Sequence, residues 1–283
     1  MDIKFHCESK YLFPNEKKLV RGFVYKNYSI EPHNHDFYEM NIILNGTGIH
    51  NIENSGFRVS SGDVFIIPPL TVHSYCDTEN LDVYHLLMHR KFIEMNYEEA
   101  TKVGGFLQLT EIEPFLRKNY SGAMFLHLSV QNLIHLENDL RYIEDGGEFN
   151  DSSYHALKYH TTWKILYWLS YLLNKQINSQ LSVKKNNHRH EIVSILDFIH
   201  HNYHKKLTID ILAKNAYMSR STFLRSFSEV CGCTPITYLT GYRCKKAREL
   251  LNEKHLSKTE IAHRCGFYDL SHMEKFLKTG IIL

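Results

Sequence analysis

Histidine and glutamate side chains at metal-ligand spacing lie near the start of the sequence. The stretch PHNHDFYEMNIILNG, residues 32–46, contains His33, His35 and Glu39, and His73 follows after a Pro-Pro pair. Imidazoles and a carboxylate that converge can bind Fe, Mn, Ni or Zn. The same groups can form hydrogen bonds with the hydroxyls of a sugar. The pattern therefore predicts a metal centre or the polar pocket of a sensor, and a structural role near a barrel mouth is the third alternative.

An extended strand would bring these side chains onto one face. Because side chains alternate along a strand, His33, His35, Glu39 and Asn41 are predicted to face one way and Tyr38 the other. A neighbouring strand is predicted to supply His73 and, close to it, Tyr75. The predicted ligand-binding residues are His33, His35, Glu39, Asn41, His73 and Tyr75. No cofactor is required by this prediction, and a divalent metal would be held by His33, His35, Glu39 and His73.

The N-terminal part of the chain has the pattern of an all-β structure. Short segments rich in Ile, Val, Phe and Tyr are separated by Gly, Asn, Ser and Pro, and they cover residues 37–46, 48–54, 56–62, 63–69 and 81–89. Several short strands at this spacing predict an antiparallel β-barrel or sandwich over residues 1–110.

From about Glu111 the apolar spacing becomes helical, in residues 114–145 and 152–176. The second of these segments has a wide apolar face, which predicts packing against the barrel, a homodimer seam within residues 154–176, or both. A polar segment, residues 179–190, is predicted to be a linker between this helical region (111–178) and a C-terminal all-α domain (191–283). The fold class is therefore α+β with two domains.

Composition supports two domains with different partners. Residues 190–283 contain 14 Lys and Arg against 9 Asp and Glu, a net charge of +5, whereas the rest has 19 against 22, a net charge of −3. A basic C-terminal third favours a polyanion partner. The six cysteines form no C-x-x-C pair, and the start MDIKFHCESK has no apolar signal segment. No apolar run approaches the roughly 20 residues that span a bilayer. We expect a cytoplasmic protein with reduced thiols and no membrane partner.

The C-terminal third contains two helices joined by a tight break. Thr208 is predicted to cap the first helix, and Ser219 to cap a second helix in which Phe223 and Phe227 face the core. A short helix, a turn and a helix with a polar, cationic first face is the pattern of a helix-turn-helix, whose second helix enters the DNA major groove. The predicted DNA contacts on this helix are Ser219, Arg220, Ser221, Thr222 and Arg225.

The same unit occurs again further along the chain. Ala213 matches Ala262 and Arg225 matches Lys275, which predicts a second recognition helix starting near Asp269. Its predicted DNA contacts are Asp269, Ser271, His272 and Lys275. A long helix capped by Thr234, with Pro235 at its first position, is predicted to connect the two units. The predicted phosphate contacts on this connecting helix are Arg243, Lys245 and Lys246.

Residues 192–278 resemble the DNA-binding domain of the AraC/XylS family of bacterial transcription regulators. The resemblance is carried by LTIDILAKNAYMSRSTFLRSFSEVCGCTPITYLTGYRCKKARELL and LSKTEIAHRCGFYDLSHMEKFLK. It implies double-stranded DNA as partner, two recognition helices in successive major-groove segments, and RNA polymerase as a further partner if the protein is an activator. The family normally continues with Gly-x-Ser-Pro-x-x-Tyr-Arg, whereas this sequence reads KTGIIL. We therefore expect weaker packing of the second unit, and a non-functional remnant is an alternative that rests on this difference alone.

The opening pattern resembles the two motifs of the cupin barrel. The matching positions are His33, His35, Glu39, Gly46, Gly62, Pro68 and His73. The second motif departs from the usual pattern at Leu70 and Asp77, where glycine and asparagine are common. In metal-dependent cupin enzymes these residues bind the metal, whereas in AraC-type regulators the barrel binds an effector.

The favoured hypothesis is a DNA-binding transcription regulator that senses a small molecule, a sugar or sugar derivative by analogy with the regulators of carbohydrate operons. The alternative is a metal-dependent cupin enzyme, such as a sugar isomerase or dioxygenase, which gives the C-terminal third no role. Fold alone does not decide the ligand.

Overall fold

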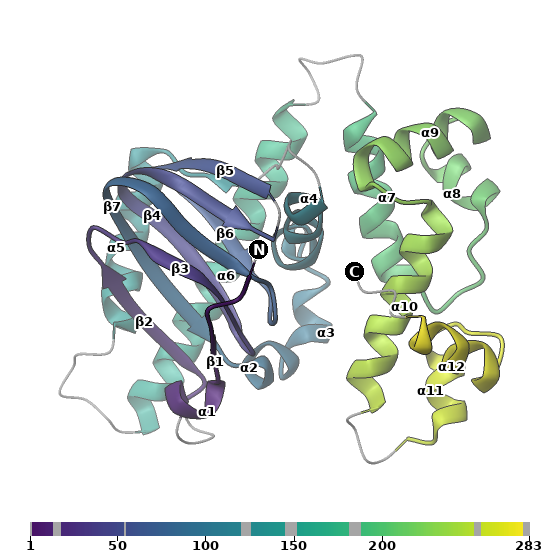
Figure 1. The fold of residues 1–283 in the computed structure, drawn as a ribbon, viewed down its shortest axis with the longest axis horizontal. Coiled ribbons are helices and arrows are strands. Elements are labelled where there is room, and N and C mark those ends of the chain that lie inside the picture. Colours follow the sequence, from purple (N-terminus) through teal and green to yellow (C-terminus); the bar gives the residue numbers. More distant parts are fainter. Residues whose placement is uncertain are drawn as a thin grey trace. The chain divides into compact units, whose positions relative to one another are not determined.

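The computed structural model describes residues 2–13, 18–53, 55–119, 126–144, 152–180, 188–251 and 256–279. The chain divides into two compact units, Met1–Val183 and Lys184–Leu283. The first unit combines a sheet with helices, and the second is helical throughout its described residues, which confirms the predicted α+β class (Figure 1). The predicted linker falls largely on residues 181–187, which lie outside the described residues.

The first unit is built on an eight-stranded sheet (Figure 1). Its strands are β1 (Phe5–Cys7), β2 (Val20–Tyr25), β3 (Ile30–His35), β4 (Tyr38–Ile52), β5 (Ser55–Ser60), β6 (Asp63–Ile67), β7 (His73–Met88) and β8 (Leu126–His127). Hydrogen-bonded neighbours follow the order β1-β3-β7-β4-β6-β8, with β2 also on β7 and β5 also on β4. Every pairing is antiparallel except that of β1 with β3. Among the described strands this path ends at β1 and β8, so the predicted barrel is an open sheet rather than a closed ring.

Two long strands, β4 and β7, connect the two halves of this sheet. They pair from Tyr38 opposite Met88 to Ile52 opposite His73, with register shifts in the middle of the pairing. On the side away from β4, strand β7 pairs with β2 along its C-terminal part and with β3 along its N-terminal part. The division of residues 37–54 into two strands at Gly46 was therefore wrong, because β4 continues through the glycine.

Gly46 allows β4 to bend without ending. Its φ is +77°, a conformation that glycine adopts at little cost, and a Cβ atom there would lie 2.2 Å from the backbone oxygen of Asn80 on β7. The segments on either side are rich in β-branched and aromatic residues, which favour extended backbone. The strand consequently resumes beyond the bend instead of turning back.

The helices of the first unit are α1 (Ser9–Leu12), α2 (Arg90–Glu94), α3 (Tyr97–Ala100), the π-helical η1 (Gln108–Ile112), α4 (Glu113–Asn119), α5 (Val130–Ile143) and α6 (Ser152–Gln180). The predicted helix 114–145 was wrong as one element, because β8 separates α4 from α5 and residues 120–125 lie outside the described residues. The predicted helix 152–176 is confirmed as α6. Trp163, Leu166 and Leu173 of α6 are buried, whereas Leu157 is 53% exposed.

A buried arginine of α4, Arg117, ties this helix to the sheet and forms an ion pair within the helix. Arg117 is 1% exposed, its Nε lies 2.9 Å from Glu113 Oε1, and its guanidinium stands 4.8 Å from the ring centre of Phe65 on β6. Arg117 also donates a hydrogen bond to the backbone oxygen of Ile66. Burial raises the pKa of Glu113, and the charge of Arg117 opposes that effect. A buried pair of this kind is costly to break from one side only.

The second unit contains α7 (Arg189–Asn202), α8 (Ile209–Asn215), α9 (Arg220–Cys231), α10 (Pro235–Leu251), α11 (Lys258–Arg264) and α12 (Leu270–Lys278). Helices α8 and α9 form one helix-turn-helix, α11 and α12 form the other, and α10 connects them (Figure 1). The predicted caps are confirmed at Thr208, Ser219 and Thr234, whose hydroxyls each accept a backbone N–H three residues on. None of the described helices is both long and apolar enough to cross a bilayer.

The two helix-turn-helix units are packed to different degrees. Phe223 and Phe227 of α9 are fully buried, as predicted. The second helix-turn-helix, made of α11 and α12, has its own core, which includes Ile261, Phe267 and Met273. Leu277, which matches Phe227, is only partly buried. The core of the second helix-turn-helix is formed, and Leu277 packs against its edge.

Replacing Glu113 with leucine should lower the free energy of unfolding of the first unit by about 3–5 kcal/mol, because Arg117 would remain buried and unpaired. Both tryptophans, Trp163 and Trp168, lie in this unit, so fluorescence during urea unfolding measures it. Glu137→Leu is the matched control, since Glu137 and Arg141 form an exposed pair at the same spacing and should contribute under about 1 kcal/mol. Equal losses in the two variants would contradict the anchoring role.

Candidate functional site

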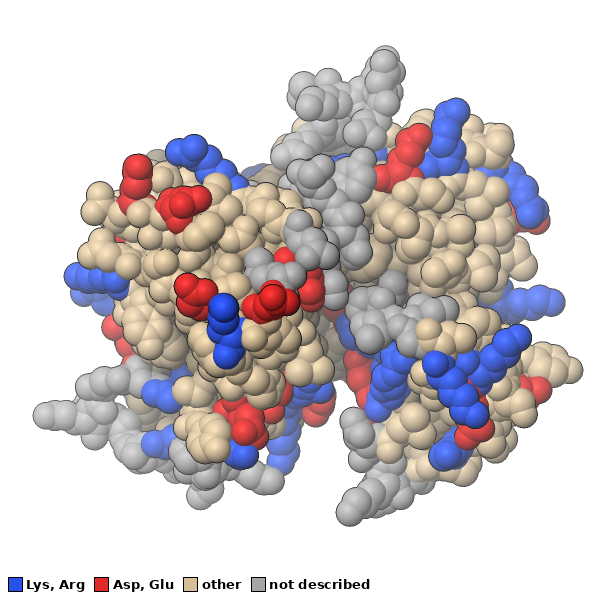
Figure 2. Space-filling model, viewed as in Figure 1, with Lys and Arg blue, Asp and Glu red and all other residues tan. Residues whose placement is uncertain are grey.

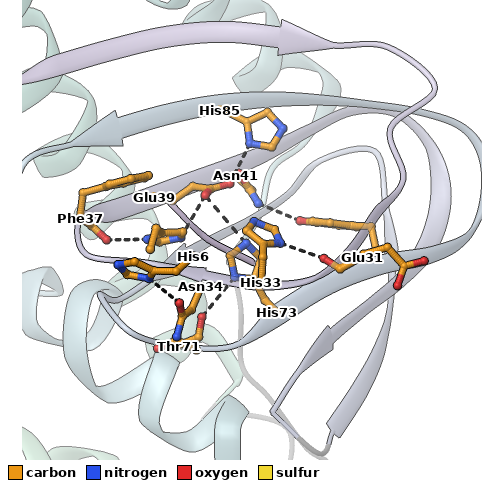
Figure 3. Close-up of polar contacts among 12 residues, drawn as sticks. His6, Glu31, His33, Asn34, Phe37, Glu39, Asn41, Thr71, His73 and His85 are labelled. Atoms are coloured by element: carbon orange, nitrogen blue, oxygen red, sulfur yellow. Dashed lines mark hydrogen bonds and ion pairs between the residues drawn. The ribbon is translucent and has the colours of Figure 1, made fainter. Parts of the chain in front are cut away.

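Polar side chains from both halves of the sheet meet inside the first unit (Figure 3). Strand β3 contributes two histidines, and the first half of β4 contributes a carboxylate and an amide. Strand β7 contributes a histidine and a tyrosine near its start and another histidine near its end. These residues are 0–4% exposed. The members of this interior cluster are His33, His35, Glu39, Asn41, His73, Tyr75 and His85. The structure therefore brings together all six predicted ligand-binding residues, although their role as ligand contacts stays a prediction.

The strand geometry that brings them together differs from the prediction. His33 and His35 lie on β3, whereas Glu39 and Asn41 lie on β4, and a bend at Asp36 and Phe37 separates the two strands. The assumption of one continuous alternating strand was wrong. The side chains share an interior because two strands in different parts of a folded sheet both point inward.

Glu39 is the centre of the cluster. His85 Nδ1 donates to its Oε1 at 2.7 Å, and the Nε2 atoms of His35 and His73 lie 3.1 and 3.8 Å from its Oε2 (Figure 3). Burial acts to raise the pKa of Glu39, but the neighbouring imidazoles of His35 and His85 outweigh it and hold that pKa well below its usual value. Glu39 is therefore a buried carboxylate anion surrounded by imidazoles.

Three histidines of the cluster are oriented in the same way. His33 Nδ1 faces the backbone oxygen of Glu31 at 3.0 Å, His35 Nδ1 that of Phe37 at 2.8 Å, and His73 Nδ1 that of Thr71 at 3.3 Å. A carbonyl oxygen only accepts hydrogen bonds, so each Nδ1 carries the proton and each Nε2 is presented to the interior. Burial lowers the pKa of His33, and it lowers the pKa of His73 to about 3, which keeps both rings neutral.

Aromatic packing closes the other side of the cluster. Asn41 Nδ2 donates to the hydroxyl of Tyr75 at 2.9 Å. The imidazole of His50 stacks between Phe65 and Tyr75, with ring centres 4.6 and 4.4 Å apart. Neither ring nitrogen of His50 has a hydrogen-bond partner among the described residues, and burial holds the pKa of His50 well below the usual value. These contacts pack aromatic rings against the polar side chains of the cluster.

His50 and His85 were missed by the sequence analysis. His85 lies opposite Asn41 in the pairing of β4 with β7, in the middle of the apolar segment 81–89. A histidine inside an otherwise apolar strand was the available signal. His50 could not be placed because the register of β4 shifts after Ile43, which breaks simple alternation.

A separate hollow lies where the middle parts of β4 and β7 meet the turn between β2 and β3. Its volume is about 440 Å³, within the range of small-molecule sites. The lining is polar and is made of Lys26, Asn27, Asn45, Gly46, Thr47, Glu79, Asn80 and Asp82. None of the predicted ligand-binding residues lines it.

The first recognition helix, α9, has the predicted polar face. Ser219 caps it, and Arg220, Ser221 and Arg225 are exposed, whereas Thr222 is half-buried. Arg220 Nη1 lies 2.9 Å from Asp210 Oδ1 on α8, so its guanidinium is held in an ion pair. Arg225 is therefore the best-placed long donor on this face.

The second recognition helix, α12, begins as predicted. Asp269 caps it by accepting the backbone N–H of His272 at 2.7 Å. Ser271 and Lys275 are exposed, and the ring of His272 packs on that of Phe276 at 5.0 Å. Figure 2 shows Lys and Arg side chains gathered on the second unit over the region of α11 and α12. The unit thus presents a cationic surface beside one of its two recognition helices.

The predicted phosphate contacts on α10 separate into two groups. Arg243 points into the unit and donates to the backbone oxygens of Tyr203 and Lys205, both at 2.8 Å. Lys246 is 8% exposed and lies 3.0 Å from Glu249. Lys245 is half-buried. Packing inside the unit accounts for Arg243 and Lys246, which leaves Lys245 as the better candidate for a phosphate contact.

Arg243→Ala should destabilise the second unit by about 1.5–3 kcal/mol, because two hydrogen bonds from a charged group to backbone oxygens are lost. Hydrogen exchange of amides in α7 and α10, read by mass spectrometry on the full chain, should show reduced protection. Lys245→Ala removes the same charge and should leave protection within about 0.5 kcal/mol of the original. If the amides of α7 and α10 exchange at the same rate in the Arg243→Ala and Lys245→Ala variants, the packing role of Arg243 is excluded.

Comparisons with known proteins give related results for both units. A "Helix-turn-helix domain" family model matches residues 212–280, and an "AraC-like ligand binding domain" model matches residues 23–131. The HTH-type transcriptional activator RhaS of Escherichia coli strain SMS-3-5 is 26% identical over 248 residues, which cover 87% of this chain and 82% of that protein.

Two solved structures are also similar. The DNA-binding domain of AdpA, in complex with a target DNA, is 29% identical with a TM-score of 0.31, covering 31% of this chain and 80% of that chain. ToxT from Vibrio cholerae O395 is 12% identical with a TM-score of 0.34, and the match covers 93% of this chain and 94% of that chain.

Proposed function

The chain belongs to the AraC-type family of DNA-binding transcription regulators, and from this premise we propose that it activates genes in response to a small carbohydrate bound by its first unit. The observation that carries the proposal is the pairing of two capped recognition helices with a buried polar cluster on a separate unit. Acting on DNA, it would work in the cytoplasm, with RNA polymerase as a further partner. The similarity to the transcriptional activator RhaS supports activation over repression.

DNA recognition is assigned to α9 and α12. Each would enter one of two successive major-groove segments, about 34 Å apart along the duplex. Arg225 can donate two hydrogen bonds to a guanine edge, and Ser221, Ser271 and Lys275 are exposed for bases or phosphates. Asp269 and Ser219 act mainly as caps in this proposal, because their side chains accept backbone N–H groups.

The effector is proposed to act on the interior cluster around Glu39. Its donors and acceptors suit hydroxyl groups, but its residues are buried, so a sugar enters only if the two halves of the sheet separate. This requirement supplies the two states that a switch needs. The ligand stabilises whichever state it binds better, and the DNA-binding arrangement shifts with it.

A homodimer through α5 and α6 is part of the proposal. Val130 and Ile134 of α5 and Leu157 and Tyr171 of α6 are 53–73% exposed, which is unusual for large apolar side chains. A second copy would bury them. The hydrodynamic mass of the full chain, with Leu157→Asp for comparison, measures this association.

A metal-dependent enzyme is the competing function. It would use the imidazoles and the carboxylate of the cluster for catalysis, but it gives the helix-turn-helix pair no role. The family relationship therefore favours regulation, and we propose that the protein has no catalytic activity.

The proposed function is tested by fluorescence anisotropy of the full chain with duplexes from the promoter regions flanking its own gene. We expect saturable, sequence-selective binding whose apparent Kd shifts when a pool of monosaccharides is added. A scrambled duplex of equal length and charge is the control for phosphate attraction. Binding that is equal for both duplexes and falls steeply with salt would contradict the proposal.

Arg225→Ala should weaken binding to the selected duplex by about 1–3 kcal/mol and leave binding to the scrambled duplex nearly unchanged, because base contacts carry sequence preference. Arg141→Ala is the matched control, since Arg141 is an exposed arginine of the first unit whose loss removes the same charge. An equal effect on both duplexes would assign Arg225 to phosphate contact instead.

A further inference from the structure

One aromatic residue of the first helix-turn-helix has a backbone conformation that suits glycine. Tyr217 lies in the turn between α8 and α9, two residues before the cap Ser219, and its φ is +55°. In this left-handed region the Cβ atom of a bulky residue crowds the backbone, so such residues seldom adopt it. The other described residues of the second unit with a positive φ are Gly232 and Gly266. The conformation of Tyr217 is therefore strained, and strain of this kind concentrates at functional sites.

The second helix-turn-helix contains a glycine at the same place in its turn. The residue after Tyr217 donates its backbone N–H to the oxygen of Ala213 at 3.0 Å. The residue after Gly266 donates in the same way to the oxygen of Ala262, which matches Ala213, at 2.9 Å. The two turns thus have the same hydrogen bonding, and a glycine at position 217 would satisfy it without crowding.

Packing within the chain does not account for Tyr217. It is 95% exposed, and its side chain makes no hydrogen bond, ion pair or ring contact with any described residue. A ring that stays in water on folding adds no burial free energy to the folded state. The side chain is therefore available to a partner outside the chain, and the free protein alone does not explain the strained backbone.

A second exposed tyrosine lies at the same end of the other recognition helix. Tyr268 is 84% exposed and comes immediately before Asp269, the cap of α12. Its backbone N–H donates to His272 Nδ1 at 3.3 Å, which holds the turn. Its side chain makes no hydrogen bond or ring contact with a described residue. Both recognition helices therefore begin beside a tyrosine whose side chain is exposed.

The DNA backbone is the partner that fits these positions. In a helix-turn-helix the first residues of the recognition helix reach the base edges of the major groove, so the residues just before its cap lie near the phosphates at the groove edge. Tyrosine hydroxyls are among the side-chain donors that bind phosphate oxygens. Lys214 and Arg225, on the two helices that the first turn joins, are exposed and attract the same polyanion. A protein partner would need a continuous apolar patch, whereas the two rings lie on separate helix-turn-helix motifs.

We propose that Tyr217 and Tyr268 each donate a hydrogen bond from the phenol hydroxyl to a phosphate oxygen of the DNA backbone, where their recognition helix enters the major groove. This inference rests on the proposed function, because it requires α9 and α12 to lie on a duplex. Phosphate contacts fix the register and orientation of a helix on DNA and carry no sequence information directly. The two tyrosines therefore position the recognition helices, and Arg225 selects the bases.

The test measures the binding of full-chain variants to the selected and scrambled duplexes by fluorescence anisotropy. Tyr217→Phe and Tyr268→Phe keep the ring and remove the hydroxyl, so each should bind both duplexes about 3–20-fold more weakly. Tyr11→Phe is the control, because Tyr11 is an exposed tyrosine of the first unit, and it should bind like the original protein. Affinities of both Tyr217→Phe and Tyr268→Phe equal to that of the original protein overturn the proposal.

Tyr217→Gly separates the DNA contact from a role in folding. Glycine adopts the left-handed backbone without crowding, so amides of α8 and α9 should exchange about 2–5-fold more slowly by mass spectrometry. The same variant should lose about 3–20-fold in affinity for DNA, since the hydroxyl is absent. A better protected helix pair that binds DNA less tightly is an outcome that a structural role cannot produce. Faster exchange in Tyr217→Gly would assign the tyrosine to the fold and overturn the proposal.

Salt dependence tests the kind of contact. A phenol hydroxyl is neutral and releases no counterion from DNA, so the slope of log K against log salt should be the same in Tyr217→Phe as in the original protein. Loss of one cationic contact would instead reduce this slope by about 1. A reduced slope in Tyr217→Phe would mean that a lysine or arginine contact has been lost, and it overturns the proposal.

Failure of this inference differs measurably from failure of the proposed function. Selective binding by the original protein, with no loss in the tyrosine variants, rejects the tyrosine contacts alone. Equal binding of the original protein to both duplexes rejects the proposed function, and the tyrosine contacts are then still measured on the scrambled duplex because they do not depend on sequence. Absence of binding to either duplex rejects both.

Discussion

The first unit depends on placing one carboxylate anion in an interior that excludes water. Glu39 is 4% exposed and ionised, and an isolated charge in that position would be strongly unfavourable. Imidazoles from β3 and β7 surround it, and they can do so only because β4 and β7 bend and bring the two halves of the sheet face to face. Burial of the Glu39 carboxylate therefore depends on the bend at Gly46, on the register shifts and on the surrounding cluster.

A second buried charge fastens the helical layer to this sheet. Arg117 and Glu113 form an ion pair next to Phe65, whose ring also stacks on His50. Because His50 stacks in turn on Tyr75 of the cluster, Phe65 and His50 connect α4 with the interior cluster. A change that separates the halves of the sheet would disturb this contact, which offers a physical route from an effector in the first unit to its helices.

The second unit contains two similar helices, which the proposed function assigns to DNA recognition. Each of them begins with a side-chain cap, Ser219 or Asp269, that accepts a backbone N–H of the first turn. Apolar residues on the opposite face hold each helix in place, more completely in the first helix-turn-helix than in the second. The cationic residues differ in role, since Arg243 supports the unit from within.

The sequence alone determined the helix-turn-helix pair, because caps, turns and i, i+4 apolar spacing are local properties that a short segment specifies. It also indicated that His33, His35, Glu39 and His73 come together, because their spacing resembles the two motifs of the cupin barrel. Only the tertiary structure decided that two strands rather than one carry them, that His50 and His85 join them, and that Arg243 and Lys246 face inward. Strand bends, register shifts and burial arise from contacts between residues far apart in the chain, and no local pattern encodes those contacts.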